Sequence, residues 1–118
     1  LVSKERGTGK TTFFNYLKHV FGVNCTQIGA KDLESDFNYH YASKLLAIID
    51  EALVSKDESV EKLKHLSTSK DIMVNNKGVT QYEQPFFGKF LLASNNIRKF
   101  IRTDEDEVRF WIRKLKKI

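Results

Sequence analysis

The chain has 118 residues and a formal net charge of +5, with 41% hydrophobic and 30% charged residues. This length and balance predict one soluble domain with a small core. Because no run of eighteen apolar residues and no secretion signal is present, we expect an intracellular protein without a membrane partner. The single cysteine, Cys25, excludes an internal disulfide, and three scattered histidines do not favour a zinc site.

The first residues, Leu1-Val2-Ser3, are typical of the end of a buried strand, and no initiator methionine precedes them. We therefore expect a piece of a longer chain whose first strand is truncated. Residues 7–12 read Gly-Thr-Gly-Lys-Thr-Thr, as in the tail of a phosphate-binding loop. The full pattern has a further glycine at the position of Lys4, and a plain glycine-rich turn is the alternative interpretation.

The residue types of this loop suit a nucleotide. Glycines let backbone amides approach an oxyanion closely, and the Lys10 amine can reach the β and γ phosphates. The Thr11 hydroxyl can ligate Mg²⁺. We predict that Thr11 is a metal ligand and that six loop residues contact the nucleotide. The six are Gly7, Thr8, Gly9, Lys10, Thr11 and Thr12.

The other elements follow from hydrophobic spacing. Residues 10–21 have helical periodicity that ends at Gly22, residues 25–28 suit a short strand or an extended link, and residues 32–44 have helix-compatible spacing. Residues 45–49 form a continuous apolar run, as in a parallel strand buried on both faces. A further helix is predicted over residues 59–66, and strands over residues 71–74, 79–82, 90–93 and 110–112. Strands interleaved with helices predict one α/β domain over residues 1–118, with a mainly parallel sheet flanked by helices.

Two predicted strands end in polar residues. Asp50 and Glu51 follow strand 45–49 at its C-terminal end, where open α/β sheets bind ligands. The first carboxylate can hold Mg²⁺, and the second can take a proton from an attacking water. Asn95 follows strand 90–93, and its amide could orient that water. Each signal alone could be a polar strand end or a turn, but together with the loop they favour a catalytic site.

Four later segments of the chain resemble motifs of a known family. They are Leu63-Lys64-His65-Leu66, Asn76-Lys77-Gly78, Leu92-Ala93-Ser94-Asn95 and Arg109-Phe110-Trp111. With the phosphate loop and the Asp-Glu strand before them, their order resembles a superfamily 3 helicase. More narrowly, it resembles the helicase domain of phage and plasmid primase-helicase proteins. The resemblance covers nearly the whole chain. It implies a P-loop NTPase of AAA+ type with a β-hairpin insertion, in the cytoplasm of a bacterium or a phage-infected host.

The resemblance also implies site roles for Mg-ATP hydrolysis. Asp50 would hold Mg²⁺, Glu51 would be the catalytic base, and Asn95 would be the polar sensor. Arg109 matches an arginine that reaches the γ-phosphate bound by a neighbouring subunit, which implies a ring, typically hexameric, around a nucleic-acid strand. A local ion pair with the acidic run 104–107 is the alternative for Arg109. The rival arginines are Arg98, Arg102 and Arg113.

Residues 75–78, Asn-Asn-Lys-Gly, are expected to form a tight hairpin tip, because Asn and Gly tolerate positive φ. In the related helicases a hairpin carries a lysine into the central channel, so the resemblance implies nucleic-acid contacts by Lys77 and Lys64. Lys77 could instead be a solvated turn lysine. The positive net charge fits a phosphate backbone, although much of it lies in the basic run 113–117, which suits a solvated face.

The predicted function is an ATP-dependent helicase motor that translocates on single-stranded or forked DNA in phage or plasmid replication, in a parent chain that could include a primase. Three alternatives stay open. They are an ATPase of the same class that acts on protein or as a loader, a non-catalytic nucleotide-binding scaffold, and a nucleic-acid-binding module with a degenerate loop. Glu51 argues against the scaffold, and Lys10 and Thr11 argue against the degenerate module.

Overall fold

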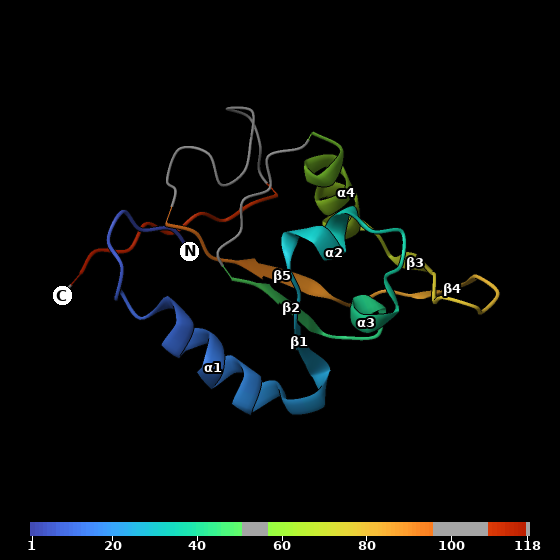
Figure 1. Ribbon diagram of the computed structural model, residues 1–118, viewed down its shortest axis with the longest axis horizontal. Coiled ribbons are helices and arrows are strands. Elements are labelled where there is room, and N and C mark those ends of the chain that lie inside the picture. Colours follow the sequence, from blue (N-terminus) through green and yellow to red (C-terminus); the bar gives the residue numbers. More distant parts are fainter. Residues whose placement is uncertain (51–56, 96–108, 118) are drawn as a thin grey trace.

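A parallel sheet lies at the centre of the computed structural model, which describes residues 1–50, 57–95 and 109–117. Its strands are β1 (Cys25–Gln27), β2 (Leu46–Ile49) and β5 (Lys89–Leu92). They lie in the order β1-β2-β5, and both neighbouring pairs are parallel (Figure 1). β2 occupies the middle because Ala47, Ile48 and Ile49 are apolar and buried on both faces. The parallel sheet predicted from the sequence is confirmed.

The first residues extend this sheet beyond β5. Val2 forms parallel bridges to Ser94 on one side and to Lys114 on the other, and Val2 and Ser3 are both buried. Ser3 N donates a hydrogen bond to Ser94 O over 3.1 Å. The strand predicted over residues 110–112 is wrong: these residues form no strand, because the register with Val2 places the pairing at Lys114 instead.

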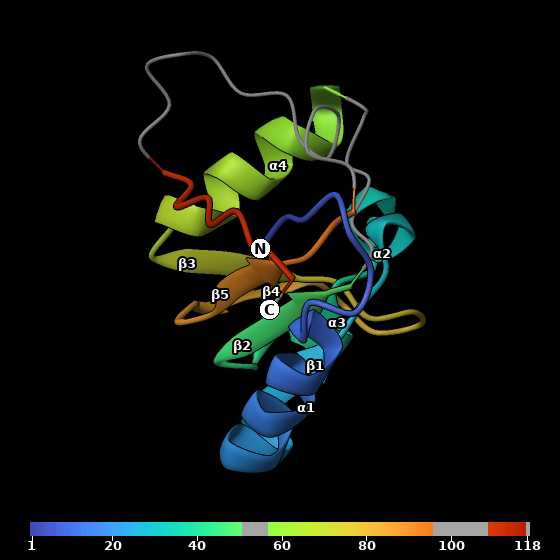
Figure 2. The same ribbon diagram turned by 90° about the vertical axis from the view of Figure 1, so that its left-hand side faces the viewer.

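Helices cover both faces of the sheet (Figures 1 and 2). They are α1 (Lys10–Phe21), α2 (Ala30–Glu34), α3 (Tyr39–Ala42) and α4 (Asp57–Thr68), and a 3₁₀ turn, Gly22–Asn24, follows α1. Successive strand residues point to opposite faces, so Ile48 packs with Phe14 of α1, whereas Ile49 belongs to the core that contains Leu33 of α2 and Leu63 of α4. Within the described ranges, no helix combines the length and apolar character needed to cross a bilayer.

The chain between β1 and β2 folds as two short helices, α2 and α3, so the continuous helix expected over residues 32–44 is wrong. Asn38 lies between them and is buried. Its side-chain amide donates to Met73 O over 2.8 Å, and its Oδ1 accepts a hydrogen bond from Asn75 N over 2.8 Å. These contacts with the neighbouring hairpin take the place of helical hydrogen bonds and interrupt the helix.

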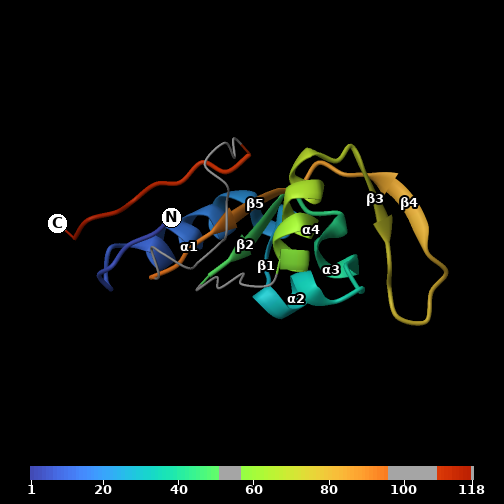
Figure 3. The same ribbon diagram turned by 90° about the horizontal axis from the view of Figure 1, so that it is seen from above.

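The predicted hairpin is present and projects away from the sheet (Figures 1 and 3). It consists of β3 (Asp71–Val74) and β4 (Tyr82–Pro85), which pair antiparallel. Two details of the prediction are wrong: the tip is not a tight turn, and the second strand does not cover residues 79–82. Phe86 N donates to Lys70 O over 2.8 Å and fixes the base of the hairpin, so the connection lengthens to residues 75–81. Lys77 remains at a turn near the tip, where Val79 N donates to Asn76 O over 3.1 Å.

Candidate functional site

A loop between Ser3 and α1 forms one wall of a pocket at the edge of the sheet. Gly7 and Gly9 have φ of 72° and 87°, which side chains rarely tolerate, so glycine is required at both positions for this backbone path. Gly9 precedes α1 and offers no side-chain cap. The first amides of α1 therefore point toward the pocket as donors for an anion.

Lys10 is drawn inward across this pocket. It is buried at 9% exposure, and its amine donates to Asn95 Oδ1 over 2.9 Å and to Thr8 Oγ1 over 3.1 Å. A third hydrogen bond goes to Ser3 Oγ. Three neutral oxygens thus hold a charged amine in place, and phosphate oxygens would be stronger acceptors for the same amine.

Thr11 and Asp50 meet on the other side of the pocket. The Thr11 hydroxyl donates to Asp50 Oδ2 over 3.3 Å, which joins the first turn of α1 to the end of β2. Both groups offer oxygen ligands, as Mg²⁺ prefers. The described residues contain no group of three or more His, Cys, Asp or Glu side chains that could hold a metal by themselves. This pair therefore suits a Mg²⁺ ion that is bound jointly with the phosphates of a nucleotide.

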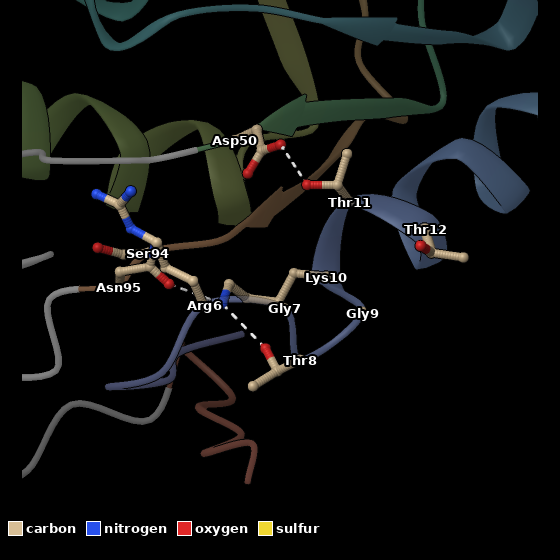
Figure 4. Close-up of a pocket in the computed structure, with 10 residues that line it drawn as sticks. All are labelled: Arg6, Gly7, Thr8, Gly9, Lys10, Thr11, Thr12, Asp50, Ser94 and Asn95. Carbon is tan, nitrogen blue, oxygen red and sulfur yellow. Dashed lines mark hydrogen bonds between the residues drawn. The ribbon is translucent and has the colours of Figure 1, made fainter. Parts of the chain in front are cut away.

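The loop, Lys10 and the Thr11–Asp50 pair enclose one pocket of about 310 Å³ (Figure 4). All six loop residues predicted from the sequence line it, together with Asp50 and Asn95. The polar residues that follow β2 and β5 thus lie at the same pocket as the loop. Two cations, one carboxylate and a series of backbone amides give the pocket the character of an anion site that can also take a divalent cation.

The remaining predicted residues are not among the described residues that line this pocket. Glu51 falls outside the described residues, as do the rivals Arg98 and Arg102. Arg109 is exposed and lines a different pocket, of about 280 Å³, beside β5. Lys77 is exposed near the hairpin tip, whereas Lys64 is buried on α4 with its amine 3.4 Å from Glu61 Oε1.

Two residues that the sequence reasoning missed belong to the site. Ser3 is fully buried, and its hydroxyl accepts from Lys10 and donates to Glu5 O over 2.7 Å. Arg6 lines the pocket and is exposed. The available signal for Arg6 was its position inside the loop pattern, between Lys4 and Gly9. Ser3 had only its place at the end of the first strand as a signal.

Known structures share this fold. The chain is similar to the C-terminal region of NrS-1, residues 305–718, in its apo form, with a TM-score of 0.81 and 23% identity over 97% of this chain and 28% of that chain. An A-form apo structure of the same region gives a TM-score of 0.80 and 24% identity over 98% and 27%. A further A-form apo structure gives 0.67 and 28% over 79% and 22%. The chain thus spans 22–28% of the length of the structures that it matches.

These likenesses agree with the α/β architecture of a parallel three-stranded sheet flanked by helices, with an added antiparallel hairpin. A search of the curated proteins gives no match. The profile of DUF5906, described as a family of unknown function, matches residues 1–113. Because this match covers nearly all of the sequence, the chain belongs to the DUF5906 family.

Proposed function

We propose that this chain is the ATP-hydrolysing core of a nucleic-acid helicase or translocase, a P-loop ATPase of AAA+ type. The observation that carries the proposal is the meeting of Lys10, Thr11, Asp50 and Asn95 in one pocket behind a loop with two left-handed glycines. These groups come from three separate parts of the sequence. A local glycine-rich turn would not explain why Lys10 and the Thr11–Asp50 pair line the same pocket.

The residues of the pocket suit binding and hydrolysis of ATP. Lys10 would exchange its three neutral acceptors for β and γ phosphate oxygens, while the loop amides hold the phosphates in place. Arg6 would add a second positive charge. Thr11 and Asp50 would hold Mg²⁺, which when bound neutralises charge that develops on the phosphates. Water would attack the terminal phosphorus and yield ADP and phosphate, with Glu51 accepting the proton and Asn95 orienting the water.

The proposed partners are single-stranded or forked DNA and further copies of the chain. Lys77 is exposed near the tip of a hairpin that projects from the body, as a contact with nucleic acid requires (Figure 3). Lys64 is buried beside Glu61, so a contact by Lys64 would need its side chain to move. Arg109 lines a pocket other than the one formed by the phosphate loop. This location fits the proposal that Arg109 acts on a neighbouring subunit in a ring.

The test is Mg-ATP hydrolysis at high protein concentration, with and without single-stranded DNA. We expect Lys10→Ala and Glu51→Gln to abolish hydrolysis, and Lys77→Ala to remove stimulation by DNA while leaving basal hydrolysis intact. Lys31→Ala, which removes an exposed lysine on α2, is the control. A hydrolysis rate that DNA does not change would favour an ATPase acting on protein. ATP binding without hydrolysis would favour a non-catalytic scaffold.

A further inference from the structure

A second surface of the molecule lies away from the phosphate pocket, where α4 ends and β5 begins. Two hollows adjoin there, of about 470 Å³ and about 280 Å³, and they share Ser67 and Lys89. We call the two together the α4–β5 groove. The segment that begins at Arg109 passes beside α4 and forms part of the wall of this groove (Figures 1 and 2). The groove thus combines residues distant in sequence.

Two aromatic rings in the groove face solvent. Phe87 is 72% exposed and Trp111 is 84% exposed, the highest exposures among the aromatic residues that the structure describes. Phe86, the neighbour of Phe87, is only 5% exposed, so the local backbone turns one ring into the core and the other outward. An exposed phenylalanine forgoes the burial free energy of its ring. A ligand that covers the ring would recover that energy.

The groove is also basic. Lys70 and Lys89 line it, and in the part of the chain that the structure describes no ion pair or side-chain hydrogen bond holds either amine. Trp111 lines the adjoining hollow, and the Arg113 guanidinium lies 5.6 Å from the centre of its ring. No carboxylate is among the described residues that line either hollow. An anionic ligand with flat rings fits this combination.

We propose that the α4–β5 groove binds single-stranded nucleic acid, with bases stacked on Phe87 and Trp111 and phosphates near Lys70 and Lys89. Stacking is open to every base, so this contact would be independent of sequence. The inference rests on the proposed function for the class of partner, but it adds a contact at the base of the β3–β4 hairpin. It is separate from Lys77, which lies near the tip.

The first test uses the only tryptophan of the chain. Binding of a single-stranded oligothymidylate should quench the fluorescence of Trp111. Phe87→Ala should weaken binding, measured by anisotropy of a labelled oligonucleotide, by about tenfold. The Lys70→Ala/Lys89→Ala double variant should reduce the slope of log K against log salt by about 1.4, since each phosphate contact to a single strand contributes about 0.7.

Matched controls remove the same chemistry elsewhere. Tyr16→Ala removes an aromatic ring that is 63% exposed on α1, and Lys31→Ala removes an exposed lysine on α2. Both variants should bind the oligonucleotide as the parent chain does. Binding that depends on Lys77 alone, with no quenching of Trp111 and no effect of Phe87→Ala, would overturn the proposal. The proposal would also be overturned if polyglutamate displaced the labelled oligonucleotide as well as an unlabelled oligonucleotide does, because an acidic peptide has no base to stack.

The outcome is distinguishable from failure of the proposed function. Mg-ATP binding measured on the same Phe87→Ala variant should equal that of the parent chain, because no described residue lines both the groove and the phosphate pocket. If the parent chain binds the oligonucleotide through Phe87 but does not bind ATP, the groove proposal is supported and the ATPase proposal fails. If ATP is hydrolysed but Phe87 has no effect on the oligonucleotide, only the groove proposal fails.

Discussion

Arg6 offers a sharp test of the phosphate pocket because its removal should affect binding and not folding. The residue is exposed, lines the pocket, and forms no hydrogen bond or ion pair in the described part of the chain. Truncation to alanine should therefore change the free energy of unfolding by no more than about 0.5 kcal/mol. A hydrogen bond between a guanidinium and a phosphate contributes about 1.5–3 kcal/mol, so Arg6→Ala should weaken ATP binding roughly 10- to 150-fold.

The assay is titration with a fluorescent ATP analogue in the presence of Mg²⁺, together with a thermal melt of each variant. Arg6→Lys should keep part of the affinity, because an amine retains the charge but loses the bidentate geometry. Lys31→Ala controls for a general loss of positive charge. An Arg6→Ala affinity equal to that of the parent chain, or equal weakening in Lys31→Ala, would refute the assignment of Arg6 to the phosphates.

Three further predictions concern stability. The Tyr41 hydroxyl is buried and has no hydrogen-bond partner among the described residues, so Tyr41→Phe should stabilise the fold by about 1 kcal/mol in urea unfolding. The exposed Tyr39→Phe should have no such effect, and destabilisation by Tyr41→Phe would contradict this. Burial, with a smaller contribution from Asp32, raises the pKa of Tyr41 to about 12 from an unfolded value of 10.0. Ionisation of Tyr41 therefore leaves stability unchanged below pH 10 and lowers it as the pH rises toward 12, by about 1.4 kcal/mol at pH 11. Melts at pH 8 and pH 11 should show this loss, and Tyr41→Phe should remove it; an equal loss in that variant would point to another group. Gly88→Ala would place a Cβ 2.6 Å from the Phe86 ring and 3.0 Å from Lys44 O, so it should destabilise by about 1–3 kcal/mol in urea. In Gly29→Ala the new Cβ would lie no closer than 3.6 Å to any described residue, so the variant should cost clearly less. Equal effects of the two variants would count against the steric reasoning.

Local patterns were sufficient for the elements nearest the phosphate pocket. The α1 helix has the predicted limits, residues 10–21, because helical spacing and the flanking Gly9 and Gly22 are all local signals. The convergence of Asp50 and Asn95 on the loop was also predictable. Parallel strands bring their carboxyl ends to the same edge of a sheet, and that rule needs only the strand order.

Contacts between distant residues decided the rest. Asn38 interrupts the expected helix because its side-chain amide forms hydrogen bonds with the backbone of Met73 and Asn75. Partners so distant in sequence cannot be predicted from a local pattern. The resemblance implies that Lys64 contacts nucleic acid, but Lys64 lies buried beside Glu61, since the packing of α4 fixes which of its faces points inward.

The sequence by itself determined the α/β class, the phosphate loop and the polar ends of the two central strands, because these depend on short-range periodicity and on residue chemistry. Only the tertiary structure decided that Ser3 contacts Lys10, that Arg6 lines the pocket, and that Phe87 and Trp111 line adjoining hollows. The physical reason is that each of these arrangements joins backbone segments whose relative position is set by packing of the whole core, which short-range patterns do not encode.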